Sequence, residues 1–218
     1  WVFPLLLCLL GLALGVSALP SPLYPIYQEE WQLNPLTITG IFAVYAIGAL
    51  ASALSAGPIS DAIGRRPILR IALVLIIAGL ILFLIADTVW VLFVARLLHG
   101  TAIGAIIVVA GAALLDVRPN DGPRNGMLSG ISLNVGIALT VIIAAVTAQW
   151  APAPLRTPFV IALIVVLMMF VGVQAMTEPH VHRTGARVRI AKPSVPPEIR
   201  TDFWFSGIGI LTSWSVLG

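Results

Sequence analysis

Two ionisable side chains, Arg96 and His99, lie within a long apolar stretch of the sequence. An ionisable residue in a membrane span is costly and is by default a candidate for function. Arg96 could bind an anionic group or control coupling; the alternative is an arginine that extends outward to the lipid headgroups. His99 lies three residues later on the same helical face and is either a proton carrier or a neutral histidine hydrogen-bonded between helices. We favour function for Arg96. For His99 we favour the neutral interpretation, because these spans contain no carboxylate.

The composition is that of a polytopic membrane protein. Of 218 residues, 59% are hydrophobic and only 10% are charged, whereas about a quarter of a soluble domain is charged. The net charge of +3 comes from arginine-rich loops, which argues against nucleic-acid binding and for membrane orientation. The single cysteine, Cys8, can build neither a disulfide framework nor a thiolate metal site, and we expect no metal or cofactor.

The apolar runs predict six membrane spans and the start of a seventh. The expected spans are 2–19, 37–57, 67–86, 89–115, 126–149 and 158–176, and another run opens at Phe203. We therefore expect a six-helix half at 1–176, a basic cytoplasmic linker at 177–202 and a partial seventh helix at 203–218. The seventh run is shorter than the roughly 20 residues a span needs, so the chain is expected to be a fragment.

The loop charges predict the orientation. The segments 57–70, 116–125 and 177–202 hold ten of the twelve Lys and Arg residues, and such an excess marks cytoplasmic loops. The segment from Pro20 to Thr37 has acids and aromatics but no Lys or Arg, and we expect it to be an outer loop. The amino terminus is then cytoplasmic.

Small and polar residues are distributed unevenly among the spans. The third and sixth spans are nearly uniform in large aliphatics, and the other four hold most of the Gly, Ser, Thr, Asn and Tyr. Polar groups in a membrane usually face the bundle interior or an aqueous cavity. We therefore expect spans 1, 2, 4 and 5 around a cavity and spans 3 and 6 outside, in two three-helix repeats. In the first span, Gly11 and Gly15 should allow close helix approach.

The spacing Gly57-x-x-x-Asp61-x-x-Gly64-Arg65-Arg66 resembles the loop between helices 2 and 3 of the major facilitator superfamily, except that Ala62 stands where a basic residue is usual. The resemblance implies that Asp61 locks the inner helix ends together with Arg65 and an acid at the end of the fourth helix, Asp116. Such a cluster acts as a bistable latch. The alternative is that these are ordinary orientation charges on a solvated loop.

Two further patterns carry the same resemblance. Arg96-x-x-His99-Gly100-x-Ala102-x-Gly104 is similar to the family's fourth-helix signature, with His99 in place of the usual Gln. Asp116-x-x-Pro119 followed by Arg124-x-Gly126 is similar to the connection between helices 4 and 5. These matches add Gly100, Gly104 and Arg124 to the candidate site.

Other candidates rest on residue type. In the fifth span, Asn134-Val135 stands where proton antiporters of the family often carry Gly-Pro, so that signature is not met. Asn134 is either a hydrogen-bonding residue of the cavity or an interhelical contact. Tyr45 is a packing aromatic first and a substrate contact second. His180 and His182 are expected to lie on a solvated loop, since no third metal ligand is near.

The resemblance implies an all-α transporter of the cytoplasmic membrane, not an enzyme. Its substrate would be a small organic solute moved by alternating access, with proton-coupled efflux as one form, and it would act as a full-length monomer. The rival interpretation is a non-transporting or heteromeric half-size membrane module. A membrane-embedded enzyme would need a cluster of nucleophile, base or metal ligands that these spans do not offer.

Overall fold

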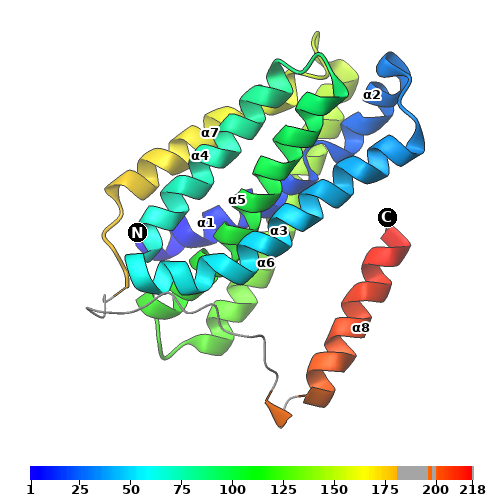
Figure 1. The fold of residues 1–218 in the computed structure, drawn as a ribbon. Coiled ribbons are helices and arrows are strands. Elements are labelled where there is room, and N and C mark those ends of the chain that lie inside the picture. Colours follow the sequence, from blue (N-terminus) through cyan, green and yellow to red (C-terminus); the bar gives the residue numbers. More distant parts are fainter. Residues whose placement is uncertain (181–195, 198–199, 218) are drawn as a thin grey trace. The chain divides into compact units, whose positions relative to one another are not determined.

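A computed structural model describes residues 1–180, 196–197 and 200–217 of this protein, which form two compact units, Trp1–Val188 and Arg189–Gly218. The first unit contains six long apolar segments, each long enough to cross a membrane. Its long helices are α1 (Val2–Ala18), α3 (Pro35–Ile63), α4 (Arg65–Leu84), α5 (Val89–Val117), α6 (Gly122–Trp150) and α7 (Thr157–Ala175). The second unit contains α8 (Arg200–Leu217). The prediction of an all-helical, six-span membrane protein with a seventh helix is confirmed (Figure 1).

The polar connection expected at 57–70 is nearly absent, and that prediction was wrong. Helix α3 continues through Pro58 to Ile63, and α4 starts at Arg65, so only Gly64 separates them. A proline inside a helix removes one backbone hydrogen bond. The carbonyl that loses its helical donor is that of Leu54, four residues before Pro58.

The segment after α1, which the sequence predicted to be an outer loop, is helical. It forms a 3-10 helix, Ser21–Leu23, and then α2, Tyr24–Trp31. Pro22 and Pro25 lie in the first positions of these helices, where the missing N–H costs nothing. Helix α2 ends at Trp31, and the next residue, Gln32, has a left-handed backbone conformation.

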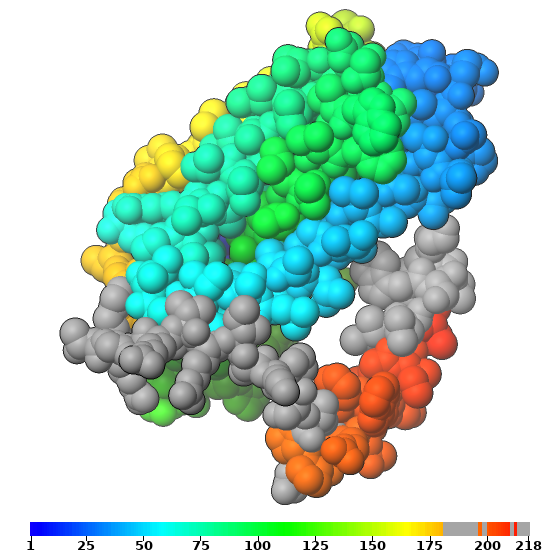
Figure 2. Space-filling model, viewed as in Figure 1, coloured from blue at the N-terminus to red at the C-terminus, as the bar shows by residue number. Residues whose placement is uncertain are grey.

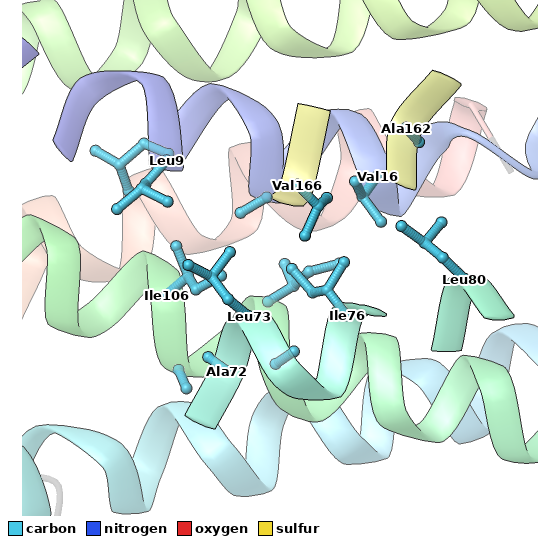
Figure 3. Close-up of a cluster of buried hydrophobic side chains, with 14 of the residues drawn as sticks. Leu9, Val16, Ala72, Leu73, Ile76, Leu80, Ile106, Ala162 and Val166 are labelled. Carbon is cyan, nitrogen blue, oxygen red and sulfur yellow. The ribbon is translucent and has the colours of Figure 1, made fainter. Parts of the chain in front are cut away.

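Helix α5 contributes the most residues to the buried core, followed by α4 and α1. Figure 3 shows aliphatic side chains of α1, α4, α5 and α7 pointing toward one another. They include Leu9 and Val16 of α1, Leu73 and Ile76 of α4, Ile106 of α5 and Val166 of α7, all of which are at most 1% exposed.

Two helix pairs cross with almost no side chain between them. A methyl group on Gly100 or Gly104 of α5 would meet the backbone of α3 at Tyr45 and Ala49. A methyl group on Gly11 would meet the Ser132 carbonyl of α6. The predicted close approach at Gly11 and Gly15 is therefore confirmed, with α6 as the partner. Helices α3, α4 and α5 lie side by side on the face shown in Figure 2.

Helix α7 packs on α4, where the ring of Phe159 stacks on Phe83 with centroids 4.6 Å apart. In this unit α4 and α7 are more buried than α3 and α6. Of the residues in the most apolar stretch of each helix, 39% and 28% are buried in α4 and α7, against 17% and 6% in α3 and α6. The expected arrangement of four helices around a cavity concerns a complete bundle, and for that bundle it stays a prediction.

Candidate functional site

Arg65 lies at the centre of a charge cluster at one end of the bundle. Its guanidinium lies 2.5 Å from Asp61 Oδ1 and 2.9 Å from Asp116 Oδ2, and it donates to the Ser60 hydroxyl at 2.5 Å. Asp61 belongs to the last turn of α3, Arg65 begins α4 and Asp116 lies in the last turn of α5. Three helix ends are therefore joined through one side chain. We call Asp61, Arg65 and Asp116 the Arg65 cluster.

The two ion pairs of the Arg65 cluster differ in exposure. The side chain of Arg65 is 6% exposed and that of Asp116 is 24% exposed, whereas that of Asp61 is 60% exposed. An exposed ion pair is screened by water and is worth about 0 to 1 kcal/mol. The pair between Arg65 and Asp116 therefore carries more of the electrostatic energy than the pair between Arg65 and Asp61.

Glu178, which the sequence did not single out, caps the start of α4. Its two carboxylate oxygens accept hydrogen bonds from the backbone N–H groups of Arg65 and Arg66, at 2.8 and 2.9 Å. The first N–H groups of a helix lack internal partners and favour a negative charge. No motif marks Glu178; the only available signal was a lone acid just after the sixth span.

Arg66 joins the start of α4 to the end of α7. Its Nε donates to the carbonyl of Val173 at 3.1 Å, and its Nη2 donates to the carbonyl of Gln174. Carbonyls at a helix C-terminus have no internal partner, and a cation there is favourable. Arg66 thus performs a different task from Arg65, although the two are neighbours in the sequence.

Gly64 allows the sharp turn between α3 and α4. Its φ of +102° lies in the region that side-chain-bearing residues rarely adopt. Gly64→Ala should therefore lower the free energy of unfolding by about 1–3 kcal/mol, read as a lower melting temperature of the purified protein. Gly57→Ala is the matched control, because a methyl there lies 3.4 Å from Val108 with helical backbone. Equal melting temperatures for the two variants would contradict the prediction.

The remaining residues at this end are only partly brought together. Arg124 lies in the first turn of α6, which begins at Gly122, and its side chain is exposed. Within the described residues Arg124 has no ion pair. Gly57 packs against α5. His180 lies half-buried with Nδ1 3.2 Å from Asp116 Oδ2, so the solvated-loop prediction was wrong for it. His182 lies outside the described residues.

Arg96 is buried in a pocket of aromatic rings. Only 1% of the residue is exposed. Its Nε donates to the Tyr24 hydroxyl at 2.7 Å, and its Nη1 donates to the Ser17 carbonyl at 2.9 Å. The guanidinium carbon lies 5.2 Å from the ring centroid of Tyr45 and 5.5 Å from those of Tyr24 and Phe42. The guanidinium therefore does not extend to the headgroups in this structure. We call these five residues the Arg96 pocket.

The Arg96 pocket stabilises a cation without a counter-charge. No carboxylate lies within ion-pair distance of Arg96 among the residues that the structure describes. The positive charge is held by aromatic faces and by one carbonyl and one hydroxyl. Tyr45 is fixed in turn by the hydroxyl of Ser17, which donates to the Tyr45 hydroxyl at 2.7 Å. Such a site can attract an anionic or electronegative group.

His99 faces α4, away from the Arg96 pocket. Its ring is fully buried, lies 5.4 Å from the ring of Phe83 and abuts Gly79. Among the described residues, the hydrogen-bonding neighbour of the ring is the backbone of Ile76 on α4. The expected shared face with Arg96 is therefore not observed, because α5 lies between α3 on one side and α4 on the other.

The other predicted site residues have packing or exposed positions. Gly100 and Gly104 form the tight crossing with α3. Asn134 is exposed on α6, and its amide donates to the carbonyl of Gly130 in its own helix at 2.8 Å. It makes no interhelical hydrogen bond within the described residues.

Comparison with known proteins extends over almost the whole chain. A sequence model of the Major Facilitator Superfamily matches residues 5–218. The chain is 27% identical over 165 residues to the galactose-proton symporter of Escherichia coli K12, covering 76% of this chain and 35% of the relative. It is 28% identical over 170 residues to the class B tetracycline resistance protein of Escherichia coli, covering 77% and 41%. The chain thus spans well under half the length of these relatives.

The solved structures agree in fold. A peptide transporter POT crystallised with alafosfalin superposes with a TM-score of 0.65 at 16% identity, over all of this chain and 45% of that one. A POT family transporter in complex with 5-aminolevulinic acid superposes with a TM-score of 0.65 at 19% identity. At these identities the likeness concerns the fold alone.

Proposed function

Because the chain belongs to the Major Facilitator Superfamily, a family of transporters, we propose that it forms one half of a secondary transporter that works by alternating access. It is a multi-pass membrane protein. The proposal adds that the rest of the protein supplies a second helical half and that the substrate binds between the halves near the bilayer midplane.

The observation that supports this proposal most is the Arg65 cluster together with Glu178. One arginine and one glutamate connect the ends of α3, α4 and α5 and the segment after α7. Charge-assisted hydrogen bonds of this kind can form in one conformation and hydrate in another. The cluster is then a latch that favours one access state, and transport requires it to open in each cycle.

The proposed substrate is a small organic solute. The relatives include a protein named for galactose and protons and another named for tetracycline resistance, so sugars and drugs are the first solutes to test. The Arg96 pocket would bind an anionic or electronegative group of the solute. Proton-coupled efflux is the finer form of the proposal, and its coupling carboxylate would lie in the other half.

The proposed location is the cytoplasmic membrane, with the Arg65 cluster on the cytoplasmic side. The support is the loop composition, since ten of the twelve Lys and Arg residues fall in the segments assigned inside. On this orientation the latch closes the inner side, and α2 lies outside.

The proposal is tested in two steps. The intact mass of the native gene product should be near twice the 23.1 kDa of this chain. The full-length protein, reconstituted in vesicles of phosphatidylethanolamine and phosphatidylglycerol, should then move radiolabelled galactose or tetracycline when a pH gradient is imposed. A mass near that of this chain would overturn the proposal in favour of a half-size module. A full-length protein that moves neither probe faster than empty vesicles would overturn the substrate class.

A further inference from the structure

A groove with a volume of about 390 Å³ runs between α6 and α7, and α1 forms its floor. Its walls are apolar and include Leu12 and Leu19 of α1, Leu139 of α6, and Pro158 and Ala162 of α7. Pockets of roughly 300–1,000 Å³ hold small ligands. No charged side chain lines the groove, so its occupant must be apolar along most of its length.

The groove exists because the two three-helix repeats pack differently. The third helix of the first repeat, α4, packs tightly against α5, the first helix of the second repeat. His99 of α5 fills the space beside Gly79 of α4. The corresponding helix α7 packs instead on α4 through Phe159 and Phe83. Helix α7 touches α1 and α6 only slightly, and this leaves a groove between α6 and α7. The floor at Gly11 and Val16 is itself buried and well packed, so the groove is a built feature and not a frayed edge.

The groove offers few polar atoms, and one of them is used by the helix pair below it. The hydroxyl of Ser132 donates to the carbonyl of Leu7 at 2.6 Å, which ties α6 to α1. Thr140 lies against Gly15 at the same crossing. A sugar or another hydroxyl-rich solute would find few partners there.

The length of the groove fits one lipid chain. Its floor extends from Cys8 to Leu19, about 16 Å along α1 at 1.5 Å per residue. One leaflet contributes about 15 Å of hydrocarbon. The end at Leu19 and Pro158 lies at the helix ends opposite Gly64. An exposed arginine, Arg156, lies two residues before Pro158 and is the only Lys or Arg between 125 and 182.

We propose that this groove binds one acyl chain of an anionic phospholipid, with the lipid phosphate at Arg156. Arginine pairs well with phosphate, and the bilayer supplies acyl chains at high concentration directly at the opening. On the proposed orientation the lipid comes from the outer leaflet. The bound chain fills the space between α6 and α7 and so completes the packing that the repeat leaves open. This site is separate from substrate transport, so it stands or falls independently of the proposed function.

The test uses the full-length protein in nanodiscs of phosphatidylcholine that contain phosphatidylglycerol with a diazirine in its acyl chain. After illumination, mass spectrometry should locate the label mainly on groove residues of α1, α6 and α7. Ala162→Trp, which fills the groove, should reduce this labelling at least fivefold. Ile164→Trp is the matched control, because Ile164 is 54% exposed on the same helix and does not line the groove. Arg156→Gln should reduce labelling about fivefold at low salt.

A second groove variant guards against misfolding of the first. Leu139 lines the groove and is 56% exposed, so Leu139→Trp adds bulk with little strain in the core. It should reduce labelling as Ala162→Trp does. Label spread evenly over the exposed faces, or unchanged in Leu139→Trp, would overturn the site. Equal labelling by diazirine-bearing phosphatidylcholine, or no effect of Arg156→Gln, would overturn the assignment of an anionic headgroup at Arg156.

Discussion

Transport by the full-length protein should fall at least tenfold when Arg65 is replaced by glutamine, with expression and membrane insertion preserved. The change removes a cation that contacts Asp61 and Asp116, and it leaves the less exposed Asp116 without its arginine partner. Hydrogen bonds to charged groups are worth about 1.5–3 kcal/mol, and a tenfold effect needs only about 1.4 kcal/mol. Initial uptake or efflux in vesicles, normalised to the amount of inserted protein, measures the result.

Three comparison variants separate the latch from general surface charge. Arg124→Gln removes an exposed arginine at the same end and should leave transport within twofold of wild type. Asp116→Asn should resemble Arg65→Gln. Asp61→Asn should also cripple transport, but less severely, because its pair with Arg65 is 60% exposed on the acid side. If Arg124→Gln impairs transport as much as Arg65→Gln does, the charges only orient the protein and the latch is wrong.

The second large effect is expected at Arg96. Arg96→Gln should reduce transport about a hundredfold, because it removes the one buried cation of the Arg96 pocket and leaves Tyr24 and Ser17 without their donor. Such a factor corresponds to about 2.7 kcal/mol, within the range for losing a charged hydrogen-bonding group. Transport is measured in the same vesicles, and the melting temperature of the purified variant is measured beside it.

Tyr24→Phe is the matched control for Arg96→Gln. It deletes only the hydroxyl that accepts from Arg96 Nε and keeps the ring beside the guanidinium. The expected loss of transport is about fivefold, since one hydrogen bond is worth about 1 kcal/mol. An Arg96→Gln protein that is as thermostable as wild type and transports normally would show that Arg96 only fills space.

The spans were predictable because each depends on a local property of the sequence. A run of about 20 apolar residues must satisfy its backbone hydrogen bonds internally, which leaves a helix as the only solution here. The close approach of α1 to another helix, which the structure shows to be α6, was predictable from the spacing of Gly11 and Gly15 in the sequence. By contrast, the extent of α3 depends on Pro58 being tolerated by its surroundings, and no propensity scale contains that information.

The candidate site was less predictable because its parts come from distant segments. Asp61, Arg65 and Asp116 could be grouped only through a family pattern, and the structure brings these three into contact. Glu178 carries no pattern, and its partners are backbone groups 112 and 113 residues away. The side of α5 that His99 faces depends on which neighbour lies there, and spacing along one helix does not contain that information.

The isolated charge of Arg96 has an electrical consequence. Arginine stays protonated in proteins, and within the described residues no carboxylate neutralises this one. It lies seven residues after the start of α5, about 10 Å along the helix, or roughly a third of the hydrocarbon thickness. A unit charge that crosses the whole membrane gains about 2.3 kcal/mol per 100 mV. A conformational change that carried Arg96 across that third would therefore couple to the membrane potential by about 0.8 kcal/mol per 100 mV.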